Sequence, residues 1–75
     1  GGPYQQSGLP DLLVIVDGRA YGLEVKRQKM GESEEHARGR ATVLQLATLE
    51  KMREAGAVTA VVLSPEEALR ALATP

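Results

Sequence analysis

Two apolar stretches flank a short polar turn near the start of the chain. The first, Leu12–Val16, is entirely aliphatic, and Asp17-Gly18 separates it from a second stretch over residues 20–26. An Asp-Gly pair in this position is typical of a β-hairpin with a two-residue loop. Because Leu12–Val16 is apolar at both sets of alternating positions, we expect this strand to lie in the middle of a sheet that is covered on both faces.

The next apolar pattern predicts a helix over residues 42–55. Thr42 and Gln45 have the spacing of a T-x-x-Q capping box at its start, and Gly56 is a typical stop signal at its end. Charged side chains occupy the face that we expect to point to water. The residues expected to face the core are Leu44, Leu46, Leu49, Met52 and Ala55.

A strand over residues 58–63 and a last helix to about residue 73 complete the pattern. Ser64 and Glu67 have the spacing of a second capping box, with proline at the first helical position. A strand, helix, strand order implies a right-handed crossover, so the strand at 58–63 should run parallel to that at 20–26. We therefore predict an α/β fold, with one domain and a small mixed β-sheet in the order β-β-α-β-α.

Composition then limits the sites and partners that are possible. The 75 residues include nine Lys or Arg, ten Asp or Glu, one His and no Cys. Disulfides and thiolate metal sites are excluded, which is compatible with the reducing cytoplasm, where we expect the protein to act. No apolar run approaches the ~20 residues of a membrane span, so we expect no membrane partner. At a net charge of −1, nucleic-acid binding would need a local basic patch or a metal ion.

The hairpin register brings three charged side chains to one place. With a two-residue loop, Asp11 lies opposite Glu24, and the alternation of side chains puts Lys26 on the same face. Two facing carboxylates repel each other unless a cation lies between them, and Mg²⁺ prefers carboxylate and carbonyl oxygens. Lys26 could then hold a water molecule or neutralise a phosphate. Taken singly, Asp11 as a turn residue and Glu24 and Lys26 as an exposed strand edge are simpler alternatives.

These residues resemble a known family. Gly8-Leu9-Pro10-Asp11, then Glu24-Val25-Lys26, then Gln45 in a helix, is similar to the VRR-NUC domain of the PD-(D/E)XK nuclease superfamily, over about residues 7–72. The resemblance implies a restriction-endonuclease-like core in which Asp11 and Glu24 bind metal, Lys26 acts in catalysis and Gln45 is a further active-site residue. The chain departs from the family pattern in having no room before Asp11 for the usual N-terminal helix with its acidic residue. Its segment between Lys26 and Gln45 is also longer than expected.

The resemblance predicts a nuclease that hydrolyses DNA phosphodiester bonds, with a preference for branched, flap or Holliday-junction DNA. We expect Mg²⁺ or Mn²⁺ to be held by Asp11, Glu24 and the carbonyl oxygen of Val25. A catalytically weak DNA-binding or assembly module that keeps the nuclease fold is the alternative. Gln45 could also serve only as the helix cap.

The segment R-Q-K-M-G-E-S-E-E-H-A-R-G-R, residues 27–40, is the longest polar stretch. A loop of this length in a small domain is either functional or mobile and solvated, and both interpretations stay open. In the functional one, phosphates would be contacted by Arg27, Lys29, Arg38 and Arg40. His36 is better explained as an exposed loop residue than as a metal ligand or general base, because no second His accompanies it.

The number of covering elements predicts a homodimer. Only two helices are expected to cover a sheet whose first strand is apolar on both faces, so part of one face would be bare. A two-fold partner can cover such a patch with its own copy.

Overall fold

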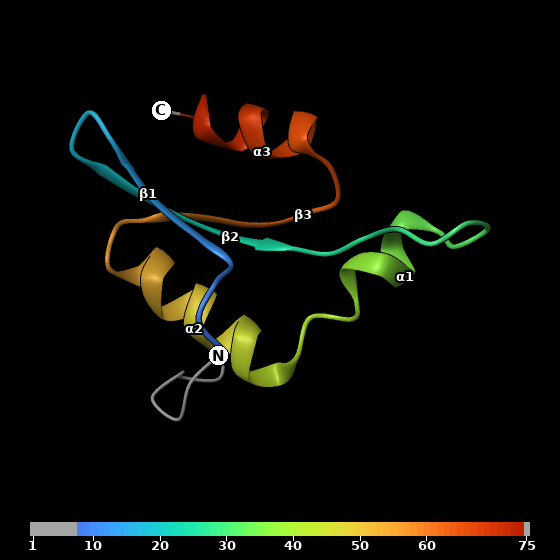
Figure 1. The fold of residues 1–75 in the computed structure, drawn as a ribbon. Coiled ribbons are helices and arrows are strands. Elements are labelled where there is room, and N and C mark those ends of the chain that lie inside the picture. Colours follow the sequence, from blue (N-terminus) through green and yellow to red (C-terminus); the bar gives the residue numbers. More distant parts are fainter. Residues whose placement is uncertain (1–7, 75) are drawn as a thin grey trace, which may run out of the picture.

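The computed structural model describes residues 8–74 and shows a three-stranded sheet with helices on both faces (Figure 1). The elements are β1 (Leu12–Val16), β2 (Arg19–Val25), α1 (Glu34–Arg38), α2 (Val43–Glu54), β3 (Val58–Val62) and α3 (Pro65–Leu72). The prediction of an α/β fold with a small mixed sheet is confirmed. The predicted order was wrong in one respect, because α1 forms within the segment 27–40 and makes the order β-β-α-α-β-α.

Local capping explains why α1 forms in a segment without apolar periodicity. The Ser33 hydroxyl accepts a hydrogen bond from the backbone N–H of His36 at 3.1 Å, and Glu34 and Glu35 occupy the first turn. Ala37 is its one buried residue. A helix that buries a single small side chain leaves no hydrophobic stripe in the sequence, so the pattern could not reveal it.

The hairpin register is as predicted. Val16 pairs with Arg19 and Leu12 with Leu23 in the antiparallel β1–β2 ladder. Asp17 and Gly18 both have positive φ angles, 50° and 78°, as a type I′ turn requires. The parallel pairing of β2 with β3 is also confirmed. These pairings place the N-terminal end of β1 beside the C-terminal end of β2.

The position of β1 in the sheet differs from the prediction. The strand order is β1-β2-β3, so β2 lies in the middle and β1 is an edge strand. Leu13 and Ile15 are 62% and 76% exposed, whereas Tyr21 and Leu23 of β2 are buried. An apolar composition favours cover on both faces of a strand. Whether the strand lies at the edge or in the middle of the sheet depends on which other strands pair with it, and those strands can be distant in sequence. The interpretation of β1 as the covered middle strand was therefore wrong.

Helix α2 covers the face of the sheet that carries Glu24 and begins with the predicted capping box. The Thr42 hydroxyl accepts from Gln45 N–H at 3.0 Å, and the Gln45 side chain accepts from Thr42 N–H at 2.8 Å. Leu49 is the buried residue of this helix. Leu44, Leu46 and Ala55, which were expected to face the core, are exposed instead, because the narrow sheet offers α2 little surface.

Helix α3 covers the opposite face, where the Tyr21 hydroxyl donates to the carbonyl oxygen of Thr74 at 2.8 Å (Figure 1). The Ser64 hydroxyl caps it by accepting from Glu67 N–H. The second capping box is only half formed, because the Glu67 carboxylate accepts from Leu63 N–H, at 2.7 Å, in place of Ser64 N–H. Over residues 8–74, no helix has the length and apolar character needed to cross a membrane.

Candidate active site

The structure brings Asp11, Glu24, Lys26 and Gln45 together at the C-terminal end of β2. The backbone N–H of Val25 donates to Oδ2 of Asp11 at 2.9 Å. The Gln45 side-chain amide donates to Oε2 of Glu24 at 3.0 Å, and Nζ of Lys26 lies 3.5 Å from the same oxygen. Asp11 precedes β1, Glu24 lies near the end of β2 and Lys26 directly follows that strand. Gln45 lies in the first turn of α2.

Glu24 is the one buried charged residue of the described chain, with only 1% of its surface exposed. Its Oε1 atom is buried without a hydrogen-bond partner among the described residues. Burial and the neighbouring Asp11 carboxylate raise the pKa of Glu24, and the attraction of Lys26 opposes them. An unpartnered carboxylate oxygen beside a second carboxylate is a site that a cation would stabilise.

The donor set suits a hard divalent cation. In an extended strand the N–H and C=O of one residue point to the same edge. The Val25 N–H points to Asp11, so the Val25 carbonyl oxygen is directed to that side as well. Over residues 8–74 no cluster of three or more His, Cys, Asp or Glu side chains could hold a metal ion. Two carboxylates and one carbonyl fit Mg²⁺ or Mn²⁺, which keep several water molecules, better than a metal that needs a complete protein cage.

The Gln45 side chain caps α2 and contacts Glu24 at the same time. Its Oε1 accepts from Thr42 N–H, and its Nε2 donates to Glu24. Because the capping bond uses the amide oxygen, the NH₂ group is the one that faces the carboxylate. Both interpretations made from the sequence are therefore compatible in the same side chain.

The basic residues of segment 27–40 fall into two groups. Arg38 forms a double contact with the Glu67 carboxylate, at 2.6 and 3.0 Å, and also contacts Glu34 and the carbonyl oxygen of Val61. The guanidinium of Arg38 and then the N–H of Leu63 lower the pKa of Glu67 to about 2. These contacts tie α1 to β3 and α3.

Arg40 is engaged in the same way, with Glu32 at 2.9 Å and with the carbonyl oxygen of Arg27. By contrast, the side chains of Arg27 and Lys29 are exposed and have no ion-pair partner within residues 8–74. Phosphate contacts by Arg38 and Arg40 stay a prediction, but those guanidinium groups would have to share or leave their carboxylates. His36 is exposed, and its Nε2 atom lies 3.9 Å from Oε2 of Glu32.

Sequence reasoning missed the Arg38–Glu67 pair. The two residues are 29 positions apart and belong to helices that do not share an apolar pattern. The only local signal was the position of Glu67 in the first turn of α3, and that signal pointed to a different partner.

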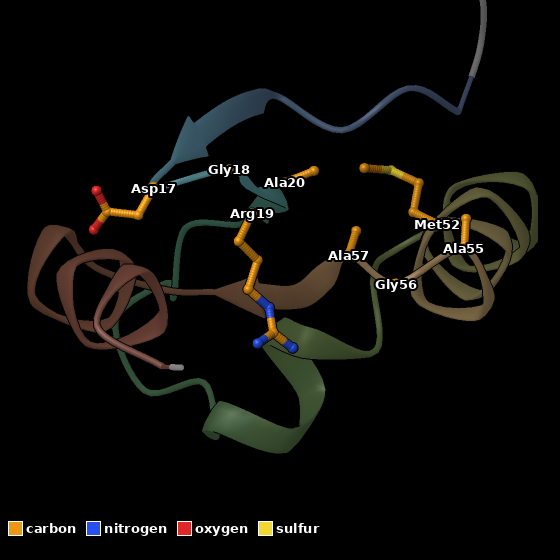
Figure 2. Close-up of a pocket in the computed structure, with 8 residues that line it drawn as sticks. All are labelled: Asp17, Gly18, Arg19, Ala20, Met52, Ala55, Gly56 and Ala57. Carbon is orange, nitrogen blue, oxygen red and sulfur yellow. The ribbon is translucent and has the colours of Figure 1, made fainter.

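A cavity of about 590 Å³ lies at the other end of the sheet, beneath the hairpin turn. Figure 2 shows Ala20 and Met52 pointing toward each other across it, whereas Asp17 and Arg19 point away from Met52. Its lining has no converging acidic or nucleophilic side chains, so the Asp11–Glu24 end of the sheet remains the candidate site.

Comparison of the chain with protein-family models, with curated proteins and with solved structures found no match. The similarity to the VRR-NUC domain therefore stays a resemblance of motifs, carried by Asp11, Glu24, Lys26 and Gln45.

Proposed function

We propose that this protein is a metal-dependent nuclease that hydrolyses phosphodiester bonds of DNA. The observation that carries the proposal is the buried, unpartnered Oε1 of Glu24 next to the Asp11 carboxylate, with Lys26 on the same face. Lys26 and Gln45 contact only the other carboxylate oxygen, Oε2, so a bound cation would offset the cost of burying Oε1 beside a second carboxylate.

Each side chain has a distinct part in the proposed reaction. Asp11, Glu24 and the Val25 carbonyl would hold Mg²⁺ or Mn²⁺, and the ion would supply Lewis-acid chemistry for a phosphoryl oxygen and for a water molecule. Lys26, with its side chain 19% exposed, can reach a phosphate while it stays beside Glu24. Its ammonium stabilises the negative charge that builds on the phosphate in the transition state. Gln45 fixes the orientation of the Glu24 carboxylate.

DNA would approach over the C-terminal ends of the parallel strands. Arg27 directly follows Lys26, and Lys29 is close behind it, so two exposed cations lie next to the site in sequence. Positive side chains of this kind hold the phosphate backbone without reading base sequence. This fits an enzyme that recognises branched, flap or Holliday-junction DNA by shape.

One observation favours a second candidate, a DNA-binding or assembly module with weak catalysis. The described chain offers two carboxylates to a metal and no cluster of three. A site with fewer charged ligands binds divalent cations less tightly.

A cleavage assay with a matched pair of variants tests the proposal. Wild type, Asp11→Asn and Glu50→Gln are incubated with single-stranded, duplex, flap and four-way-junction DNA in Mg²⁺, Mn²⁺ or EDTA. Glu50 is an exposed carboxylate of α2 that pairs with Arg53, so Glu50→Gln removes the same charge without changing Asp11, Glu24, Lys26 or Gln45. We expect metal-dependent cleavage by wild type and Glu50→Gln, and none by Asp11→Asn.

Calorimetric titration with Mn²⁺ separates the two candidates. A nuclease should bind Mn²⁺ and lose that binding in Asp11→Asn. DNA binding with neither Mn²⁺ binding nor cleavage would reject the nuclease and favour the binding module.

A further inference from the structure

Strand β1 has the features of an interface. It is the edge of the sheet, and its five residues, LLVIV, include no charged residue, proline or glycine. Proteins usually protect exposed edges with charges, prolines, bulges or short strands, because a bare edge pairs with other chains. Within the described residues, no strand pairs with the outer edge of β1, and the charged residues Asp11 and Asp17 lie only beyond its two ends. This combination indicates a partner that adds a strand.

The hairpin register fixes which backbone groups face outward. The residues on either side of a two-residue turn form a hydrogen-bonded pair, and such pairs alternate along the ladder. Val16 flanks the turn, so Leu12, Val14 and Val16 direct their N–H and C=O groups to β2. Leu13 and Ile15 therefore direct theirs to the open edge.

We propose that β1 pairs with β1 of a second copy of this chain, antiparallel and around a two-fold axis at Val14. In this register Leu13 lies opposite Ile15 of the second copy, so the outward backbone groups meet as hydrogen-bonded pairs. All five residues of β1 then face aliphatic side chains, which no shifted register achieves. The sequence of β1 is thus complementary to itself, which is the requirement of an isologous interface.

The two copies would form one continuous six-stranded sheet. Leu13 and Ile15 are the most exposed side chains of β1, and those of both copies would meet on the face that α2 covers in each copy. The same register places Asp11 opposite Asp17 of the second copy at both ends. Like charges at this distance repel and are screened by salt, so the association should strengthen as salt is added.

Sedimentation equilibrium at micromolar concentration tests the association. We expect wild type to be a dimer and Ile15→Lys to associate at least about tenfold more weakly. Val43→Lys is the matched control, because Val43 is an 85% exposed aliphatic residue that belongs to α2 and not to β1. A monomeric wild type, or an Ile15→Lys variant that dimerises as wild type does, would overturn the proposal. So would an association that weakens with salt.

Single cysteine variants test the register. The chain contains no Cys, so each variant has one thiol. Val14→Cys places two thiols across a close, non-hydrogen-bonded pair, where a disulfide can form. Under mild oxidation we expect Val14→Cys to become a linked dimer far faster than Leu13→Cys or Ile15→Cys. Faster linkage at either neighbour would refute the register.

Hydrogen exchange distinguishes a second copy from cover within one chain. The Leu13 and Ile15 amides should be protected in wild type at micromolar concentration and should lose that protection on dilution. Protection that persists in a proven monomer would show that another segment of the same chain pairs with β1, and would reject the dimer. These readouts do not depend on metal binding or cleavage, so the proposed function can fail without affecting them.

Discussion

Replacing Glu24 by Gln should stabilise the metal-free protein. The change keeps the shape of the side chain and removes a charge that is 1% exposed, beside Asp11. It also supplies an NH₂ group that can donate to the Asp11 carboxylate, whereas Oε1 of wild-type Glu24 has no hydrogen-bond partner. An unsatisfied buried polar group costs about 1 to 3 kcal/mol. The attraction of Lys26 opposes the gain, and only part of it is lost because the Gln side-chain oxygen can still accept from the Lys26 ammonium.

The net expectation is a free energy of unfolding that rises by about 1 kcal/mol, which is a melting temperature about 4 to 8 °C higher for a domain of this size. With bound Mn²⁺, wild type should become more stable than Glu24→Gln. At a hundred times its dissociation constant, Mn²⁺ would stabilise wild type by about 2.7 kcal/mol and leave Glu24→Gln nearly unchanged.

Thermal denaturation of both proteins with EDTA and with Mn²⁺ provides the measurement. Glu50→Gln is the matched control, because Glu50 is an exposed α2 residue paired with Arg53 at the surface; its stability should change by less than ~1 kcal/mol in either condition. A Glu24→Gln protein that melts below wild type in EDTA would refute the view that the Glu24 carboxylate destabilises the metal-free protein. Equal stabilisation of both by Mn²⁺ would place the metal elsewhere.

Three further predictions concern other charged residues: Lys26 in the candidate site, Arg27 and Lys29 next to it in sequence, and the Glu67–Arg38 pair. Lys26→Ala should abolish cleavage in the nuclease assay while the circular dichroism spectrum and DNA affinity stay near those of wild type, and unchanged turnover would remove Lys26 from the mechanism. Changing Arg27 and Lys29 together to Ala should weaken DNA binding and reduce its salt slope by about 2, since two phosphate contacts are lost; an unaltered slope in fluorescence anisotropy would exclude them. Glu67→Gln should lower stability at pH 7 by about 1 to 3 kcal/mol because it breaks a charged, double contact with Arg38. The folded-state pKa of about 2 lies below the ordinary 4.5, so wild type should lose this stability as pH falls from 4.5 toward 2, and melting curves of Glu67→Gln should lack that part of the decline.

Local signals predicted much of the fold and of the candidate site. The Asp17-Gly18 turn determines the hairpin register, and that register alone places Asp11 near Glu24. The Thr42–Gln45 capping box determined where α2 begins. Each of these features depends on residues that are close in sequence or are linked by one turn, so the pattern contains the necessary information.

The features that were missed depend on distant segments. The edge position of β1 follows from which neighbours β2 acquires, and the apolar composition of β1 is the same at an edge as in the middle. The pairing of Arg38 with Glu67 requires α1, β3 and α3 to be assembled first. Exposed and paired arginines look alike in a sequence, so the basic residues of segment 27–40 could not be sorted in advance.

The double role of Gln45 links the site to the local stability of a helix end. Helix termini fray on short timescales, and a first turn that opens normally affects only its own backbone. Here the opening of Thr42 from Gln45 would also free the amide that orients Glu24. Amide exchange at the start of α2 and order at the Glu24 carboxylate should therefore vary together, so that a ligand held by Glu24 would slow the fraying of α2.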